Sequence, residues 1–365
     1  MRRRRRIVGV VVLCSSGQGV RGFVVRGGAP TVRRGSVIRR AANDNGKNNN
    51  GFAAGPYGFH GLPVEKPIAF QGEFGAYSEE AAYQHFGSSI TTLPCKSFQD
   101  VFNAVDAGEA AYGMLPMENS NAGSINKSYD LLMEYDLRVH GETTLRVKHS
   151  LLALPNDDGS PVIVDRVRSH PQALAQCEKY LTAQGLAIEA GSDTAGSARE
   201  IAQNKLHGVG AICSKLAAER YGLDVLATGI EDNKFNFTRF FCLGKGVNPN
   251  PIATAKTSII FAVSDKPGSL VAALEEFGRR TVNIIKLESR PRRRTISPGF
   301  NYIFYLDFQG HHADPPCAAA LMRLLESCAF VKLLGSYEAA PQPRDLFNAE
   351  AAIETPTLDP ALMQI

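Results

Sequence analysis

A proline-rich break near residue 250 is the feature that most restricts how this chain can fold. Asn248-Pro249-Asn250-Pro251 places two prolines within three residues. Proline fixes its own φ angle and removes a backbone donor, so neither a helix nor an interior strand continues through such a segment. It is typical of a turn-rich linker. The 365-residue chain therefore divides here into two separate patterns.

Before this linker, short apolar runs alternate with segments that open on helix-capping residues. The expected strands are 67–70, 112–116, 150–154, 164–168 and 208–213. The expected helices start at Ser78, at Asn126, near His170, after Asp193 and at Ser214. Strands that alternate with helices predict an α/β architecture. In such sheets ligands bind at the carboxyl ends of strands, against helix N-termini.

After the linker the pattern restarts as β-α-β-β-α-β. The expected strands are 257–263, 283–289, 302–308 and 331–337, and the expected helices are 269–278 and 313–328. This order predicts a ferredoxin-like unit. Residues 341–365 are expected to form a loosely ordered tail.

The N-terminal segment has the composition of a targeting sequence. Residues 1–43 contain 11 Arg and no Asp, Glu or Lys, which fits an organellar transit peptide. A secretory signal and a plain N-terminal extension are the alternatives. The apolar run Ile7–Cys14 is too short to span a bilayer. Residues 43–65, rich in Asn and Gly, are expected to be a disordered linker.

Charge and cysteine content exclude several classes of protein. Of the 40 Lys and Arg residues, 29 lie beyond residue 43, where 36 Asp and Glu residues give a formal charge of −7. The basic excess lies in the leader, so no nucleic-acid partner is expected. The 7 cysteines form no CxxC pair, and no His/Cys/Asp cluster has metal-ligand spacing, so we expect no metal.

Several short motifs follow one another in an order that identifies a family. They are Gly72-Glu73-Phe74-Gly75-Ala76-Tyr77-Ser78-Glu79, Pro116-Met117-Glu118-Asn119-Ser120, Ser169-His170-Pro171-Gln172-Ala173-Leu174, Asp193-Thr194-Ala195-Gly196-Ser197-Ala198, Asn236-Phe237-Thr238-Arg239-Phe240, Gly268-Ser269-Leu270-Val271 and Glu288-Ser289-Arg290-Pro291. From Pro67 to Tyr337 the chain resembles prephenate and arogenate dehydratases with a C-terminal ACT regulatory domain. The targeting leader resembles that of the plastid members.

The resemblance implies a fold and domain boundaries. The fold class is α/β, with a two-lobed periplasmic-binding-protein-like catalytic domain and a ferredoxin-like ACT domain. The catalytic domain is expected at 66–246, with lobe one at 66–147 and 235–246 and lobe two at 148–234. The ACT domain is expected at 255–339, the tail at 340–365 and a transit peptide at 1–42.

The resemblance also implies the chemistry. Such an enzyme removes a ring hydroxyl and carbon dioxide from arogenate, giving L-phenylalanine, or from prephenate, giving phenylpyruvate, and needs no cofactor. Thr238 is the expected catalytic residue, acting at the leaving hydroxyl. A threonine hydroxyl is a weak acid, so it needs polarising neighbours. The alternative is a strand residue with a satisfied hydroxyl.

Substrate contacts are expected from both lobes. Arg239 can grip a carboxylate bidentately, or can form a structural salt bridge. For Phe240 a place in the core is favoured over stacking on the substrate. The other candidates are Glu118, Asn119 and Ser120 beyond a strand end, and Ser169, Gln172 and Thr194 at helix starts, where simple capping is the alternative.

The ACT unit is expected to bind L-phenylalanine as an effector, between two subunits of a homodimer or homotetramer. A role as an oligomerisation platform alone is the alternative. The candidate effector contacts are Gly268, Leu270, Val271, Asn283, Glu288 and Ser289.

A catalytically inactive amino-acid-binding protein of the same fold is the rival interpretation, and the retained Thr238 and Glu118-Asn119-Ser120 disfavour it. No membrane partner is expected. The plastid-type leader favours chloroplast location and arogenate over prephenate.

Overall fold

The computed structural model describes residues 64–248, 252–291 and 302–354, and the chain forms two compact units. Among the described residues, the larger unit includes 64–258, Gln309–His311 and the chain from Leu334 onward. The smaller unit includes Ile259–Phe308 and His312–Leu333. The expected transit peptide, nearly all of the linker at 43–65, and the last part of the expected tail lie outside the described residues.

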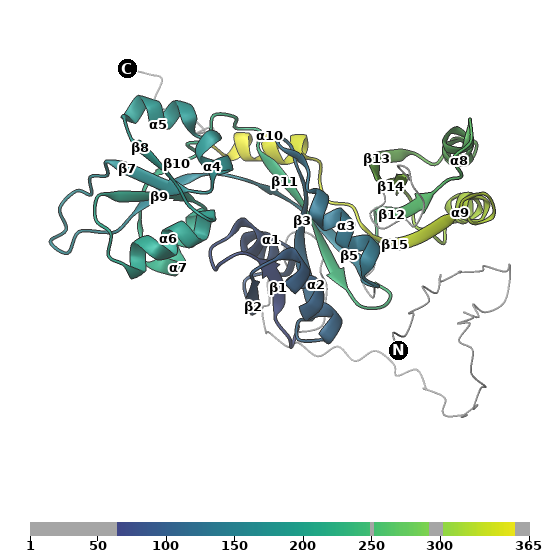
Figure 1. Ribbon diagram of the computed structural model, residues 1–365, viewed down its shortest axis with the longest axis horizontal. Coiled ribbons are helices and arrows are strands. Elements are labelled where there is room, and N and C mark those ends of the chain that lie inside the picture. The colour runs from purple at the N-terminus through teal and green to yellow at the C-terminus, as the bar shows by residue number, and fades with distance from the viewer. Residues whose placement is uncertain (1–63, 249–251, 292–301, 355–365) are drawn as a thin grey trace, which may run out of the picture. The chain divides into compact units, whose positions relative to one another are not determined.

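The first sheet of the larger unit has the strand order β2-β1-β3-β11-β5, with β4 paired to β3 (Figure 1). Its strands are β1 (Ile68–Gln71), β2 (Thr92–Cys95), β3 (Tyr112–Asn119), β4 (Gly123–Ser124), β5 (Arg138–Arg146) and β11 (Phe237–Gly244). Strand β1 runs parallel to β2 and β3, whereas β11 runs antiparallel to β3 and β5. The last strand in sequence therefore lies inside the sheet.

Helices cover both faces of this sheet. They are α1 (Tyr77–Phe86), α2 (Phe98–Ala107) and α3 (Asn126–Glu134). Met114 of β3 is in one apolar cluster with Ala81 and Ala82 of α1. A Cβ on the adjacent Gly113 would meet Val101 of α2 at 2.8 Å. Since successive strand residues face opposite sides, α1 and α2 lie on opposite faces.

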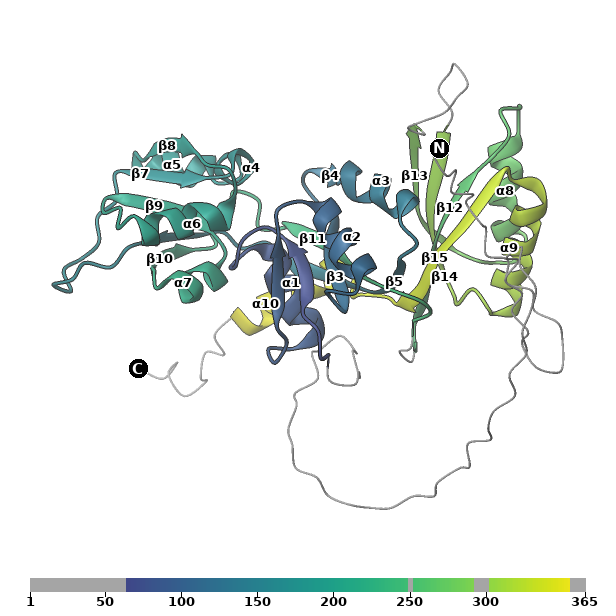
Figure 2. The same cartoon turned by 60° about the horizontal axis from the view of Figure 1, so that its bottom comes forward.

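The second sheet has the order β10-β6-β9-β7-β8. Its elements are β6 (Ser150–Ala153), β7 (Arg166–Ser169), α4 (Pro171–Ala175), α5 (Glu178–Gln184), β8 (Ala187–Ala190), α6 (Thr194–Gln203), β9 (Val209–Cys213), α7 (Lys215–Tyr221) and β10 (Asp224–Thr228). Val209, Ala211 and Cys213 pack in one cluster with residues of α6 and α7, while Ile212 packs with residues of α4 and α5. Figure 2 shows the α6–α7 pair and α5 around this sheet.

The C-terminal sheet has the order β13-β14-β12-β15. Its elements are β12 (Ala255–Ala262), α8 (Ser269–Gly278), β13 (Ile284–Pro291), β14 (Tyr302–Gln309), α9 (Pro315–Ser327) and β15 (Phe330–Glu338). Phe277 of α8 and Leu324 of α9 share one core with Phe261 and Phe308 of the sheet. Both helices therefore cover the same face (Figure 2).

The predicted fold class is confirmed: a two-lobed α/β part is followed by a ferredoxin-like βαββαβ part. The bounds expected for α8 are those observed. One expectation is wrong. The C-terminal tail is not loosely ordered throughout, because α10 (Pro343–Glu354) forms there. The centre of the Phe347 ring in α10 lies 5.7 Å from the centre of the Phe235 ring. The Arg146 guanidinium lies 4.9 Å from the centre of the Phe347 ring.

The loop between β1 and α1 joins the two lobes. Glu73 forms an ion pair with Arg199 of α6 at 3.0 Å, and Ser214 donates a hydrogen bond to the Gly75 carbonyl at 2.6 Å. The buried carboxylate of Glu79 accepts from the Gly75 N–H and from Arg220 of α7, both at 2.6 Å. The motif around Gly72–Glu79 thus holds the lobes together.

The start of α1 differs from the one expected from the sequence. Ser78 was expected to cap α1, but the helix begins at Tyr77 after Ala76, without a side-chain cap. Ser78 is buried instead.

Gly75 provides a test of the lobe contact. Its φ is +86°, and an added Cβ would lie 2.6 Å from the Ala217 Cα. We expect Gly75→Ala to lower the free energy of unfolding by about 2–4 kcal/mol, because overpacking adds to backbone strain. Gly222→Ala is the control, since Gly222 has φ +65° and no atom within 4 Å of an added Cβ. It should cost about 1 kcal/mol. Equal losses in urea unfolding would show that the close approach to Ala217 is unimportant.

Candidate functional site

Two of the sequence motifs meet where β11 pairs with β3. Thr238 lies opposite Asn119, and Arg239 lies opposite Glu118. The register then shifts, because Met117 is an extra residue on β3 and Phe240 lies opposite Pro116. Such a bulge re-aims the side chains beside it. Segments almost 120 residues apart in sequence thus form two consecutive cross-strand pairs, and the strand expected to end at 116 continues through Asn119.

The Asn119 amide organises this end of the sheet. Its Nδ2 donates to Thr238 Oγ1 at 3.0 Å, to Asn236 Oδ1 at 2.9 Å and to the Phe237 carbonyl at 3.1 Å. Its Oδ1 accepts from the backbone N–H groups of Asn121 and Ala122, each at 3.0 Å. Because a carbonyl can only accept and a backbone N–H can only donate, these partners fix the orientation of the amide.

This orientation decides what the Thr238 hydroxyl can do. Its oxygen accepts from Asn119, so its own proton remains available for donation to a ligand. A hydroxyl that accepts a hydrogen bond is polarised and becomes a better donor. Thr238 is 8 % exposed, and water therefore competes little for this proton.

A further chain of hydrogen bonds runs from Asn236 into the second lobe. Asn236 Nδ2 donates to Gln176 Oε1 at 3.2 Å, and that oxygen also meets His149 Nε2 at 2.9 Å. Burial lowers the pKa of His149, so the ring is neutral near pH 7. Its Nε2–H then donates to Gln176, and its Nδ1 meets the Tyr77 hydroxyl at 2.8 Å.

Arg239 lies on the other side of the strand from Thr238, because adjacent strand residues face opposite ways. Its Nε is 2.8 Å from Glu118 and its Nη1 is 3.2 Å from Glu142, and its guanidinium lies 4.9 Å from the centre of the Phe241 ring. Of the two alternatives for Arg239, the structure shows the structural salt bridge. Its two carboxylate partners belong to the protein.

The remaining lobe-one candidates have clear places. Ser120 Oγ donates to the Phe235 carbonyl at 3.2 Å and accepts from the Phe237 N–H at 3.0 Å, which fixes the chain on either side of Asn236. Phe240 is buried with Ile68 and Phe70 in the lobe-one core, as the sequence favoured.

The lobe-two candidates differ from one another. Ser169 is fully buried and donates to the Ile212 carbonyl at 2.6 Å, so it is a strand residue and not a helix cap. The cap of α4 is His170, whose Nδ1 accepts from the Gln172 N–H. The Gln172 side chain is exposed, one turn before Gln176. Thr194 is the half-buried first residue of α6, which Asp193 caps.

The candidate effector residues lie in two stretches of the smaller unit. Gly268 precedes α8 with φ +83°, which glycine adopts without strain. Leu270 packs on the core of that unit, whereas Val271 is 60 % exposed. Asn283 precedes β13 and is exposed, as is Ser289, while Glu288 is half-buried within the strand.

The described part of the chain shows neither a metal-binding cluster nor a membrane-spanning helix. It contains no group of three or more His, Cys, Asp or Glu side chains able to hold a metal ion. Within the same ranges, no helix is both long and apolar enough to cross a bilayer.

The family profile of prephenate dehydratase matches residues 68–248. The chain is 43 % identical over 277 residues to a chloroplastic arogenate dehydratase/prephenate dehydratase of Arabidopsis thaliana, and the match covers 74 % of this chain and 72 % of that one. The chain belongs to the prephenate dehydratase family. The recognition made from the ordered motifs is therefore confirmed.

Solved structures agree with this assignment. A prephenate dehydratase from Arthrobacter aurescens in complex with L-Phe is 30 % identical, with a TM-score of 0.66 over 79 % of this chain and 98 % of that one. A protein described as a novel type of quorum-quenching acylase is 35 % identical, with a TM-score of 0.68 over 76 % of this chain and 99 % of that one. The shared fold therefore extends over both parts of the chain, and it is not tied to a single reaction.

Sequence reasoning did not single out four residues that the structure brings to this dehydratase-family site. They are Tyr77, His149, Gln176 and Glu142. Tyr77 lies within a recognised motif, and His149 directly precedes an apolar strand. Gln176 follows a recognised motif by two residues, and Glu142 lies in a strand that was not predicted. Only the three-dimensional pairing gives their positions.

The Asn119 amide yields a prediction. We expect Asn119→Asp to lower turnover about 100-fold and the free energy of unfolding by about 2–3 kcal/mol, because a carboxylate would face three acceptors. Asn121→Asp is the matched control. Asn121 Oδ1 accepts from Asn233 at 2.8 Å, which a carboxylate still does. Unfolding and steady-state assays measure both effects, and similar behaviour of the two variants would contradict the assigned role.

A second prediction concerns Glu80 on α1. Burial raises its pKa to about 7, and the negative charge of Glu219 on α7 adds to the shift. The folded protein thus retains this proton between about pH 4.5 and 7, where the unfolded chain loses it. Stability from this group falls as pH rises through that window and stays lower above it.

Glu80→Gln removes the titration. The free energy of unfolding of the variant minus that of the parent should be larger at about pH 8 than at about pH 5. The expected increase in this difference is on the order of 1–2 kcal/mol. Urea unfolding of both proteins at the two pH values measures this increase. A difference between parent and variant that does not change with pH would refute the shifted pKa.

Proposed function

We propose that the protein is a carbon–oxygen hydro-lyase that dehydrates and decarboxylates arogenate, prephenate or both. The observation that carries this proposal is the hydrogen bond from Asn119 Nδ2 to Thr238 Oγ1 at 3.0 Å. It leaves the polarised Thr238 hydroxyl able to donate to a departing oxygen. Membership of the prephenate dehydratase family supports the same reaction.

In this reaction the ring carbon–oxygen bond breaks and the ring carboxylate leaves as carbon dioxide. The electron pair of the broken carbon–carbon bond completes the aromatic ring, and the departing hydroxide takes up a proton to become water. Formation of the aromatic ring drives the reaction. The protein then has to orient the substrate and stabilise charge on the leaving oxygen, which a preorganised donor does without reorganisation. Thr238 is that donor.

The substrate has a carboxylate on its ring and another on its side chain, and the protein must hold both. Gln172 and Thr194, with exposed or half-buried side chains in the second lobe, and Ser120 in the first are the proposed contacts. Ser169, which is buried and donates to the Ile212 carbonyl, is proposed to support this lobe indirectly. The Tyr77–His149–Gln176–Asn236 chain crosses between the lobes. Closure on the substrate would therefore be felt at Asn119 and Thr238.

Arogenate and prephenate differ only in the side chain, which bears an ammonium group in one and a keto group in the other. The Arabidopsis relative is named for both activities. Arogenate is the proposed preferred substrate, and a plastid is the proposed location, because that relative is chloroplastic. The rival function is an inactive binding protein of the same fold.

Regulation by L-phenylalanine is proposed for the ferredoxin-like part. The Arthrobacter relative was solved in complex with L-Phe. Gly268, Leu270, Val271 and Asn283 with Glu288 and Ser289 are the proposed contacts. The proposed assembly is a homodimer or homotetramer in which two such units face each other.

The test is turnover of both substrates without added metal or cofactor. Thr238→Ala should lower kcat by two to four orders of magnitude, because the donor to the leaving oxygen is lost. Thr144→Ala is the control: Thr144 is a buried threonine of the neighbouring strand β5 and lies opposite Arg239. It should keep kcat within about threefold. Thr238→Ser should retain measurable activity.

The outcome separates the alternatives. A folded wild-type protein that is inert on both substrates but binds phenylalanine would support the inactive binding protein. Hydrolysis of an acyl amide without dehydration would support the acylase chemistry named for the structural neighbour. Full activity of Thr238→Ala would remove Thr238 from the mechanism.

A further inference from the structure

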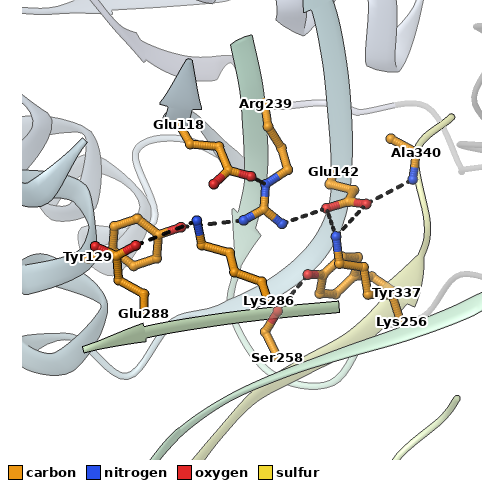
Figure 3. A network of polar contacts seen from close by, with 10 residues as sticks. All are labelled: Glu118, Tyr129, Glu142, Arg239, Lys256, Ser258, Lys286, Glu288, Tyr337 and Ala340. Carbon is orange, nitrogen blue, oxygen red and sulfur yellow. Dashed lines mark hydrogen bonds and ion pairs between the residues drawn. The ribbon is translucent and has the colours of Figure 1, made fainter. Parts of the chain in front are cut away.

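The carboxylate of Glu142 is the centre of a buried polar network in the larger unit (Figure 3). Its side chain is 2 % exposed. It is 3.2 Å from Arg239 Nη1, 2.9 and 3.1 Å from Lys256 Nζ, and 3.0 Å from the Ala340 N–H, which donates to it. A buried carboxylate needs this number of donors and opposite charges to be stable.

One side of the network holds the catalytic strands. Glu142 lies on β5 opposite Phe241 of β11, two residues from Arg239 and on the same face. Arg239 bridges Glu142 to Glu118 of β3. Glu118 and Arg239 form the cross-strand pair next to Asn119 and Thr238. The ion pair between Glu118 and Arg239 therefore helps to fix the spacing and register of β3 and β11 where Asn119 donates to Thr238.

The other side of the network involves the start of β12 and the segment just after β15, the first and last strands of the C-terminal sheet in sequence. Lys256 lies at the start of β12, and Ala340 lies two residues beyond the end of β15. Nearby, Tyr337 of β15 accepts or donates a 2.6 Å hydrogen bond with Ser258 of β12, and its ring contacts Phe241 edge-on at 5.6 Å. All of these residues belong to the larger unit.

We propose that Glu142 is a positioning residue for dehydration and the contact through which the segment from β12 to β15 acts on Thr238. This inference rests on the proposed function. The four charged side chains balance, with Glu118 and Glu142 against Arg239 and Lys256. A shift of β12 or β15 changes how Lys256 and the Ala340 N–H hold Glu142. Arg239 and the backbone beside Thr238 then move with it, so a ligand of that segment alters turnover without touching the substrate.

A purely structural role is the competing explanation, and kinetics separate the two. Glu142→Gln keeps the shape but removes the charge that Arg239 and Lys256 both contact. We expect kcat to fall about tenfold or more with KM changed less than about threefold, because the substrate contacts remain. Glu142→Asp, which keeps the charge, should recover part of the loss. The change in kcat/KM that saturating L-phenylalanine produces should shrink at least threefold in Glu142→Gln.

Two further variants complete the design. Glu79→Gln removes another buried carboxylate, which contacts Arg220 and the Gly75 N–H between the lobes. It should lower stability while leaving the phenylalanine response unchanged. Lys256→Gln keeps a donor beside Glu142 but removes its charge. It should weaken the phenylalanine response, and it tests the proposal if Glu142→Gln does not fold.

Each outcome decides something. If Glu142→Gln folds and keeps both its kcat and its response to phenylalanine, the proposed role of Glu142 is wrong. The dehydratase proposal still stands in that case, provided that the wild-type protein is active. Wild type that is inert on arogenate and prephenate overturns the dehydratase proposal itself. Turnover unaffected by saturating phenylalanine in the wild type, or an undiminished response in Lys256→Gln, overturns the coupling through β12 and β15.

Discussion

The antiparallel insertion of β11 between β3 and β5 is the interaction on which the site depends. The chain leaves the first sheet after β5, forms the second lobe, and returns as β11 to the middle of the first sheet. An interior strand has its register fixed by partners on both sides, because a one-residue slip would turn every side chain to the other face. Thr238 is therefore placed opposite Asn119 by the pairing of β11 with a strand on each side.

The sequence predicts well those elements whose signal is local. Helices that follow Asp193 and Ser214 begin where those residues cap them. Strand β5 was missed because Arg138–Arg146 contains Glu, His, Arg and two Thr, which do not form an apolar run. Its buried polar residues have partners that are distant in sequence. Glu142, for example, forms an ion pair with Lys256. Helix α10 was missed for a similar reason, since the Phe347 ring packs on Phe235 and Arg146.

The same distinction applies to the site. The motifs identify Thr238, Asn119 and Ser120. The structure joins Asn119 to Thr238 by a hydrogen bond, whereas Ser120 accepts from the N–H of Phe237, the residue before Thr238. A motif does not say which side chains lie beside a strand residue in the folded protein, so it could not decide between the two roles considered for Arg239. Strand alternation separates Thr238 from Arg239: Thr238 meets a neutral amide, whereas Arg239 meets two carboxylates. The guanidinium of Arg239 is thus paired with two acids of the protein itself.

The chain passes between the lobes twice, after β5 and before β11, and both segments contact α10. Arg146 stands at the end of β5 where the chain leaves for the second lobe, and Phe235 stands just before β11 where it returns. The Phe347 ring contacts both. The ring therefore links the two segments through which the chain passes between the lobes. The chain after β15 reaches these segments through α10, while Ala340 of the same stretch donates a hydrogen bond to Glu142.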